Sequence, residues 1–315
     1  MPKIDIVIVN WNSGEQLHDC LRSITAVSRD GFGFSNIIVV DNASTDGSAD
    51  RLGNLDLPLT VIYNDNNRGF AAACNQGAAR SKADYLLFLN PDMRLFENSL
   101  SSPIAFMERP ENQHIGIVGI QLVDGSGRVS RTCARFPTAK RFLAKMLGLD
   151  RLFPRVFHGH FMVEWDHKDS REVDQVMGAF FLVRRNLFEV LGGFDVRFFV
   201  YFEDLDFSLR ARQLGYSSFY LAEAQAYHKG GGTSEQIKAR RLFYSLRSRI
   251  LYGYKHFNWG SATFLTFCTL TIEPITRIVF AVMKGAFVDV IETLKAYKLL
   301  WSDIPRMALK EKKFT

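Results

Sequence analysis

The sequence predicts an α/β fold in which a mostly parallel sheet has helices on both faces. Five nearly continuous runs of Val, Ile and Leu lie in the first 124 residues, and helix-like stretches separate the first four of them. Strands that are apolar throughout are buried on both faces, which is typical of parallel sheets with helical crossovers. The runs are IDIVIVN (4–10), NIIVVDN (36–42), LTVIYN (59–64), ADYLLFLNPD (83–92) and IGIVGIQLVD (115–124).

Three helices are predicted between these strands, at residues 14–27, 44–52 and 69–81. Ser13, followed three residues later by Gln16, is a capping-box pattern that predicts the start of the first helix.

The pattern weakens after residue 124. Residues 131–175 mix basic residues, Phe and three histidines without clear periodicity, which indicates a long, mobile loop with short helices. Order returns in four predicted elements: a strand within 176–185, a helix at 186–191, a helix that begins at Glu203, and a strand at 216–222.

The composition fits a large globular domain, because a chain of 315 residues with 47% hydrophobic residues can bury a substantial core. Four cysteines lie far apart without C-x-x-C spacing, so we expect neither a zinc site nor a disulfide framework, as in a reducing cytosol. The first residues lack the pattern of a secretory signal, so we expect no export by that route.

The C-terminal segment is basic and apolar. Residues 240–315 hold thirteen Lys and Arg against five Asp and Glu, which predicts an anionic partner such as acidic lipid or nucleic acid. Two apolar runs, 257–272 and 278–283, are separated by Glu273-Pro274. Each run is shorter than the roughly 20 residues of a membrane-spanning helix. We therefore interpret the segment as an interfacial helical hairpin; the alternative is a buried helical pair that packs on the sheet domain.

Polar residues follow the predicted strands, at the edge where open parallel sheets bind ligands. Asp41 can accept hydrogen bonds from a base or a ribose, although it or Ser44 could instead cap the next helix. Arg68 and Gly69 provide a phosphate-binding cation and close backbone approach. Asp92 can hold a cation that prefers oxygen ligands, although Asn-Pro-Asp is also a common turn.

Three carboxylates, Glu203, Asp204 and Asp206, lie near aromatic residues at a predicted helix start. An apolar setting raises the pKa of a carboxylate and suits it to general-base work, while the helix dipole also favours acids in a first turn. His228 could bind a metal or phosphate, or have a structural role. The chain has no P-loop, no complete G-x-G-x-x-G after a strand and no G-x-S-x-G elbow, which argues against those classes of site.

Together these segments resemble glycosyltransferase family two, whose GT-A fold joins a nucleotide-binding parallel sheet to an acceptor-binding half. The similarity is greatest to bacterial rhamnosyltransferase-like enzymes of cell-surface polysaccharide assembly. It implies a nucleotide-sugar-binding half (1–124) and an acceptor-binding half (125–235). The basic, amphipathic helical segment that follows (236–315) is expected to contact the membrane because of its charge and apolar runs. The matching stretches are IVIVNWNSGEQLHDCLRSI, VVDNASTDGS, NRGFAAACNQG, LFLNPDMRL, MGAFFLVRRNLFEVLGGFD and YFEDLDFSLRARQLGY.

The resemblance also assigns roles to residues. It implies that Asp204 is the general base for the acceptor hydroxyl, and that Asp92 and His228 hold Mg²⁺ or Mn²⁺. Asn90 stands where the family's D-x-D metal motif has its first acid, so one carboxylate fewer faces the cation. The implied donor-binding residues are Asn10, Asn12, Asp41, Arg68, Gly69, Asn90 and Asp92, and the implied acceptor-binding residues are Gly178, Ala179 and Glu203.

We therefore predict an inverting glycosyltransferase that moves a sugar, with rhamnose the leading candidate, from a dTDP- or UDP-sugar to a saccharide or lipid-linked saccharide. The Q-x-x-R-W arrangement of processive synthases is absent, which favours single transfers. We expect peripheral contact with the cytoplasmic face of the membrane and no nucleic-acid binding. The alternatives are a sugar-phosphate nucleotidyltransferase, which the lack of a glycine-rich basic loop after the first strand disfavours, and an inactive sugar-nucleotide-binding protein.

Overall fold

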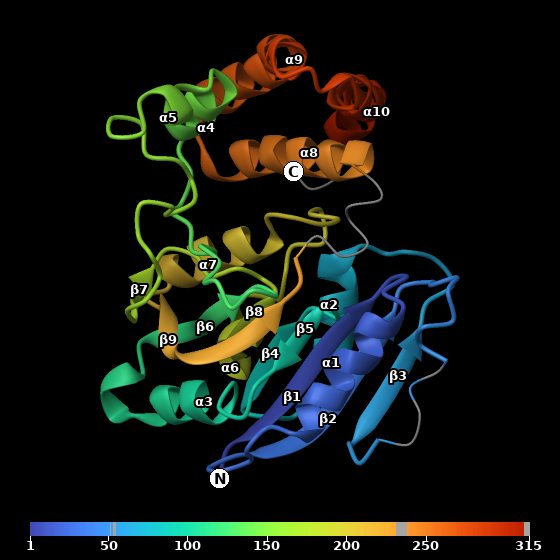
Figure 1. The fold of residues 1–315 in the computed structure, drawn as a ribbon, viewed down its shortest axis with the longest axis vertical. Coiled ribbons are helices and arrows are strands. Elements are labelled where there is room, and N and C mark those ends of the chain that lie inside the picture. Colours follow the sequence, from blue (N-terminus) through green and yellow to red (C-terminus); the bar gives the residue numbers. More distant parts are fainter. Residues whose placement is uncertain (51, 53–54, 231–237, 312–315) are drawn as a thin grey trace. The chain divides into compact units, whose positions relative to one another are not determined.

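The structure is a computed structural model that describes residues 1–50, 52, 55–230 and 238–311 (Figure 1). The chain divides into two units. The first comprises Met1–Phe136, Phe161–Phe199 and a segment that begins at Glu203 and includes the last strand. The second comprises Pro137–His160, Val200–Phe202 and the C-terminal helices. Two segments that precede the predicted boundary near residue 235 are thus grouped with the C-terminal helices.

A nine-stranded mixed sheet forms the centre of the first unit, in the order β3-β2-β1-β4-β8-β6-β9-β5 with β7 paired to β9. The strands β1 to β4 are parallel, and β8 runs antiparallel to both β4 and β6. The five apolar runs form β1 to β4 and β6, which confirms that prediction. The strands are β1 Lys3–Asn10, β2 Gly33–Asp41, β3 Leu59–Tyr63, β4 Tyr85–Leu89, β5 Met93–Leu95, β6 Ile115–Val123, β7 Arg171–Val173, β8 Phe180–Arg184 and β9 Ser217–His228.

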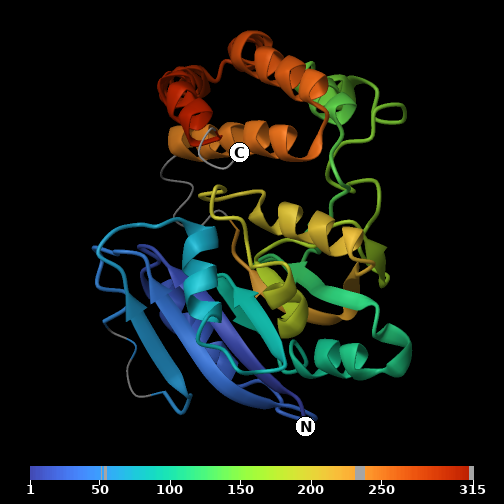
Figure 2. The same ribbon diagram turned by 180° about the vertical axis from the view of Figure 1, so that it is seen from behind.

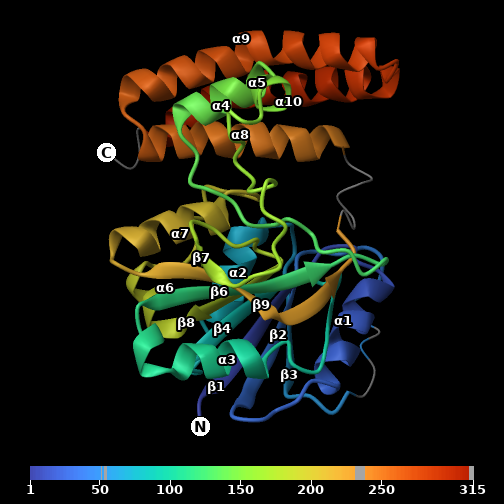
Figure 3. The same cartoon turned by 60° about the vertical axis from the view of Figure 1, so that its left-hand side comes forward.

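Helices cover both faces of this sheet, as predicted (Figures 2 and 3). On one face α1 and α3 pack against alternate strand residues, and on the other face α2, α6 and α7 do so. Because successive residues of a strand point to opposite faces, the continuous apolar runs supply both cores. The helices are α1 Glu15–Thr25, α2 Phe70–Ala78, α3 Ser101–Glu108, α6 Arg185–Val190 and α7 Glu203–Gln213, with a short 3₁₀ turn η1 at Pro110–Asn112.

Two local predictions near the first helices are wrong. The N-cap of α1 is Gly14 at φ 56°, not Ser13, because the Ser13 hydroxyl donates to the side chain of Asn10 instead. The predicted helix at 44–52 is also absent: in the described residues of this stretch the chain forms turns. The side chains of Asn10 and Asp41, at the ends of β1 and β2, form hydrogen bonds with Ser44 and Ser48 of this loop. These hydrogen bonds take the place of the backbone hydrogen bonds of a helix.

The region 131–175 is more ordered than predicted, since it contains α4 Ala139–Met146, α5 Leu149–Leu152 and β7. His167 is fully buried, and its ring stacks on Trp165 with the centroids 4.1 Å apart. Its Nε2 accepts from the Cys133 N–H at 3.1 Å, and its Nδ1 donates to the Trp165 carbonyl at 3.0 Å. The carbonyl of His167 accepts from Gln121 of β6 at 2.7 Å and from the Tyr220 hydroxyl of β9 at 3.0 Å, and these two bonds attach this end of the region to the sheet.

The second unit is built mainly from α8 Lys238–His256, α9 Trp259–Met283 and α10 Phe287–Glu311. The predicted break at Glu273-Pro274 is wrong, because α9 continues through Pro274 and turns only before α10. Glu273 is 3% exposed and lies beside Arg249 of α8 and Arg277 of its own helix. Of the helices the structure describes, α9 alone is long and apolar enough to cross a membrane, a property that core helices share.

Candidate active site

The carboxyl ends of β1 and β2 meet in a buried polar network. Asn10 is fully buried, and its Nδ2 lies 2.7 Å from Asp41 Oδ1 and 2.8 Å from the Ser48 hydroxyl. The other Asp41 oxygen accepts from the backbone N–H of Ser44 at 3.0 Å. Asp41 therefore closes a turn after β2, where the sequence left open a helix cap.

Asn12 joins the same network from the loop after β1. It adopts the left-handed conformation, with φ 52°, which asparagine tolerates better than most residues. Its N–H donates to the Ser44 hydroxyl at 3.0 Å, and its Oδ1 accepts from Thr45 N at 2.7 Å. The structure thus brings Asn10, Asn12 and Asp41 together, while their contact with a nucleotide stays a prediction.

Asn42 was not among the predicted site residues, although it links the loop after β2 to the loop after β3. Its Nδ2 donates to Asn67 Oδ1 at 3.1 Å and lies 3.2 Å from the carbonyl of Gly69. Its Oδ1 accepts from Asn64 Nδ2 at 3.1 Å and from Arg68 N at 3.2 Å. The sequence did contain a signal for this contact. Several asparagines follow the third strand, and an Asp-Asn pair ends the neighbouring second strand, so that the two polar segments meet at one edge of the sheet.

Gly69 has a structural explanation besides its predicted contact with phosphate. Its φ is 87°, and a Cβ atom there would lie 2.6 Å from the carbonyl of Phe199. The adjacent N–H of Phe70 donates to that same carbonyl at 2.6 Å. The side chain of Arg68 is exposed, so it can reach a ligand in solution.

Asp92 and His228, the two predicted metal ligands, lie side by side. Asp92 follows β4, and His228 ends β9 directly opposite Met93 in the β5–β9 ladder. Their Oδ2 and Nε2 atoms are 3.4 Å apart, and the side chains are 11% and 12% exposed. Asn90 is half-buried at the start of the same turn.

This pair fits a cation that is shared with a substrate. Within the described part of the chain, no group of three or more His, Cys, Asp or Glu side chains could enclose a metal. Magnesium and manganese at phosphate sites are commonly held by one or two protein ligands, with phosphate oxygens and water completing the shell. One carboxylate and one imidazole can therefore hold such a cation only when the oxygens of a bound diphosphate complete its ligand shell.

Asp204, the predicted general base, lies in the first turn of α7. Its Oδ2 accepts from the Gly178 N–H at 2.9 Å, and its Oδ1 accepts from Leu205 N at 2.8 Å. Burial raises the pKa of Asp204, while these two hydrogen bonds oppose the shift. A partly exposed carboxylate with a raised pKa is suited to accept a proton.

Glu203 precedes this aspartate but is buried. Its Oε2 has no hydrogen-bond partner among the residues that the structure describes. Burial, and then the charge of Asp204, raise the pKa of Glu203 well above its usual range. The two residues before it, Tyr201 and Phe202, have φ angles of 68° and 73°, a strained conformation that costs about 1–3 kcal/mol per residue and is common at functional sites.

A short path of backbone joins the two ends of the site. Gly178 holds Asp204, and the carbonyl of the next residue, Ala179, accepts from the N–H of Asn90 at 2.9 Å. Asn90 opens the turn that carries Asp92, and Ala179 leads into β8, which pairs with β4. Asp92 and Asp204 therefore lie at the same end of the β4–β8 strand pair. Ala179 is itself buried, and the predicted acceptor contacts of Gly178, Ala179 and Glu203 stay predictions.

The fold and the comparisons define a glycosyltransferase. The model of the family "Glycosyl transferase family 2" matches residues 5–192, which contain the predicted donor-binding residues, the Asp92 turn and Gly178. The chain belongs to this family.

Relatives and solved structures agree with this assignment. N-acetylglucosaminyl-diphospho-decaprenol L-rhamnosyltransferase of Mycobacterium tuberculosis is 24% identical over 277 residues, covering 82% of this chain and 87% of the relative. Rhamnosyltransferase WbbL of Escherichia coli K12 is 25% identical over 192 residues, covering 60% and 69%. The mannosyltransferase PcManGT from Pyrobaculum calidifontis, solved with GDP-Man and Mn²⁺, superposes with a TM-score of 0.54 at 16% identity, covering 98% and 81%, and shows the GT-A fold.

Proposed function

We propose that the chain is an inverting, non-processive glycosyltransferase that transfers one sugar from a nucleoside diphosphate sugar to a saccharide or lipid-linked saccharide during cell-surface polysaccharide synthesis. The observation that carries this proposal is the path from Asp204 through Gly178 and Ala179 to Asn90. It supports one site with a proton acceptor at one end and a diphosphate-binding carboxylate at the other.

The reaction then needs two events at the anomeric carbon. The acceptor oxygen forms a bond to this carbon as its proton passes to Asp204 Oδ1 or Oδ2, and the bond from the carbon to the diphosphate oxygen breaks. Attack from the face opposite the leaving group inverts the anomeric configuration. The hydrogen bond from Gly178 fixes the direction of the carboxylate, and orientation of this kind lowers a barrier by about 1–4 kcal/mol, on the order of ten- to thousandfold in rate.

The negative charge on the departing diphosphate must be offset as it develops. A Mg²⁺ or Mn²⁺ ion bound at Asp92 and His228 would supply this Lewis-acid stabilisation. Arg68, exposed at the end of the neighbouring loop, is the protein cation that we assign to the diphosphate. The half-buried position of Asp92 limits competing water, which strengthens its interaction with a cation.

Rhamnose, carried by dTDP, is the sugar that we assign to the donor. Two relatives whose names state rhamnosyl transfer support this choice. The relative from M. tuberculosis is named for a diphospho-decaprenol acceptor, and on that basis we assign a lipid-linked saccharide to this chain.

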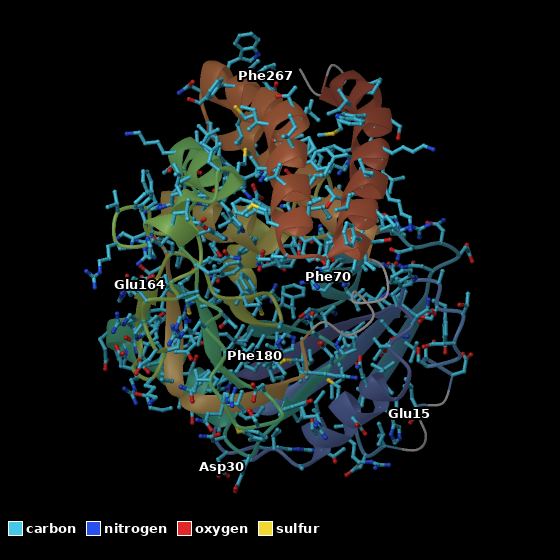
Figure 4. The ribbon with its side chains drawn as sticks, turned by 45° about the horizontal axis from the view of Figure 1, so that its top comes forward. Glu15, Asp30, Phe70, Glu164, Phe180 and Phe267 are labelled. Atoms are coloured by element: carbon cyan, nitrogen blue, oxygen red, sulfur yellow. The ribbon has the colours of Figure 1, made fainter. Side chains whose placement is uncertain are left out.

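We also propose that the second unit contacts the cytoplasmic face of the membrane. Large apolar side chains are exposed along α9 and α10, among them Phe267, labelled in Figure 4, which is 58% exposed. Exposed apolar surface of this extent marks contact with a membrane or a partner protein. The positive charge of residues 240–315 favours an anionic membrane.

The decisive variant is Asp204→Asn, which keeps the shape of the side chain and removes its basicity. We expect donor binding, measured by calorimetry with Mn²⁺ present, to change less than about threefold, while transfer falls by at least about a thousandfold. Asp30→Asn is the matched control, because Asp30 is exposed before β2, at the opposite end of that strand from Asp41. Full transfer activity in Asp204→Asn would refute the role of this base.

A further inference from the structure

A cavity of about 390 Å³ lies inside the helical unit, with walls from α4, α8, α9 and α10. Its volume falls within the range of small-molecule sites. All of its lining residues belong to the second unit, so it is separate from the site that holds Asp92 and Asp204. The charged residues on the wall are the cations Lys145, Lys238, Arg277 and Lys284 and the anions Glu273, Asp289 and Glu292.

The carboxylates on this wall already have cations beside them. Asp289 lies 3.8 Å from Lys238, and Glu292 lies 2.8 Å from Lys295, which is outside the lining. Glu273 has two guanidinium groups beside it. The three anions are thus outnumbered by the cations around them, and the cavity carries excess positive charge.

Two guanidinium groups flank the lining carboxylate Glu273. Arg249 is 6% exposed, contacts Glu273 and Thr269, and has an Nε atom without a partner in the described part of the chain. Arg277 binds the same carboxylate at 2.8 Å. Burial, followed by the charges of Arg249 and Arg277, lowers the pKa of Lys145. The two guanidinium groups around this one carboxylate leave a net positive charge, which a bound anion would offset.

The same helices carry an apolar stripe beside the polar one. On α9 the lining residues recur every three or four positions, as expected for one helix face, and exposed apolar residues alternate with them. Met283 is 76% exposed and Phe287 is 68% exposed, on either side of the lining residue Lys284. The exposed stripe consists of Ile275, Val279, Val282, Met283, Phe287, Val288, Ile291 and Leu294.

A cationic cavity beside an exposed apolar stripe matches the two parts of an anionic lipid. We propose that the cavity between α4, α8, α9 and α10 binds the phosphate group of a membrane lipid, while the apolar stripe of α9 and α10 contacts its acyl chains. The proposal rests on the membrane contact included in the proposed function, and it assigns that contact a specific headgroup site. A phosphate monoester suits the cavity best, because it carries the most charge for its size.

The test uses the full chain and dihexanoyl phosphatidic acid below its critical micelle concentration, so that no bilayer is present. Titration calorimetry compares it with dihexanoyl phosphatidylcholine, which has the same chains, and with inorganic phosphate, which has none. We expect phosphatidic acid to bind at least about tenfold more tightly than either. Equal binding of inorganic phosphate would mean a free-phosphate site and would overturn the lipid assignment.

The variants Lys284→Gln and Lys145→Gln test the location. Each should weaken binding of phosphatidic acid at least about fivefold. Lys298→Gln on α10 removes the same charge from an exposed position outside the cavity, and it should change binding less than about twofold. Lys284 is also exposed, so its substitution leaves the fold intact. Equal weakening by all three variants would indicate general charge attraction and would contradict the site.

Transfer from dTDP-rhamnose to a short-chain lipid-linked saccharide acceptor, assayed in the same preparations, separates this inference from the proposed function. Site-specific lipid binding in a protein without transfer activity would support the cavity and reject the transferase proposal. Normal transfer without binding of phosphatidic acid would reject the cavity alone.

Discussion

The backbone N–H of Gly178 donates to the carboxylate of Asp204 at 2.9 Å, across two segments that are distant in the sequence. The absence of a side chain at residue 178 favours this contact, because a Cβ atom would lie 3.0 Å from Asp204 Oδ2 and would push the carboxylate away by a few tenths of an ångström. The glycine before β8 therefore sets the direction of the proposed base.

Replacing this glycine should misplace the base without removing it. We expect Gly178→Ala to lower kcat about 10- to 100-fold, because a small displacement of a catalytic group costs roughly this much. Donor affinity should stay within about twofold, as calorimetry will show. Gly125→Ala is the control, since a Cβ atom there would meet only the edge of Tyr227 at 3.9 Å. An unchanged kcat in Gly178→Ala would show that the contact does not position the base.

The raised pKa of Asp204 predicts the acid limb of the pH profile. The base acts only when deprotonated, so transfer should fall as the pH drops through a value above the usual 3.8 of aspartate. A profile of kcat/KM against pH measures this limb, with donor binding followed in parallel. If kcat/KM falls only at a pH at or below the ordinary pKa of aspartate, burial does not raise the pKa of this base.

Glu203 should lower stability at neutral pH. Its pKa in the folded chain lies above the usual 4.5, so the unfolded chain releases this proton first, and stability is lost as the pH rises from about that value through the folded pKa. Glu203→Gln should therefore stabilise the chain by about 1–3 kcal/mol at pH 8 and have little effect at pH 4. Urea unfolding at both pH values checks this prediction, and a stability difference that does not depend on pH would count against it.

The same variant, Glu203→Gln, also tests the predicted acceptor contact, which a raised KM for the acceptor would support.

His167 should make the fold sensitive to acid. Burial lowers its pKa below the usual 6.5, so as the pH falls below that value the unfolded chain takes up the proton first, and stability decreases down to the folded pKa. His167→Gln should remove this dependence and cost about 1–3 kcal/mol at pH 8, because the Cys133 N–H loses its acceptor. His158→Gln, an exposed control, should do neither. Identical unfolding curves for the two variants would reject this role.

The Asp92–His228 pair should set the metal requirement. Asp92→Asn and His228→Ala should each raise the Mn²⁺ concentration for half-maximal activity at least about tenfold, because the protein provides few other ligands. Donor binding titrated with and without EDTA gives a second readout. Activity that survives EDTA and both substitutions would show that the cation is not needed.

Much of the sheet was predictable because its residues are buried on both faces, so that β1, β2 and β4 are continuous apolar runs. The loop after β2 was not, since the side chains of Asn10 and Asp41 bond to it from other strands. Such long-range bonds leave no periodic signal in the sequence.

The helical unit was harder to predict for a related reason. Glu273 and Pro274 are typical of a break, but Arg249 of a different helix neutralises Glu273 and keeps it inside α9. In the site, the polar strand ends and the Glu203-Asp204 pair were visible in the sequence. The adjacency of Asp92 and His228 was implied only by the family resemblance, because the pairing of β5 with β9 that produces it leaves no local pattern in the sequence.

Anomalous diffraction from a crystal soaked with Mn²⁺ and dTDP-rhamnose tests the central claim most directly. The account predicts a manganese peak at Asp92 Oδ2 and His228 Nε2, with the diphosphate on the metal and the anomeric carbon facing the carboxylate of Asp204. A donor bound with its diphosphate away from Asp92, or with its sugar facing away from Asp204, would contradict the account.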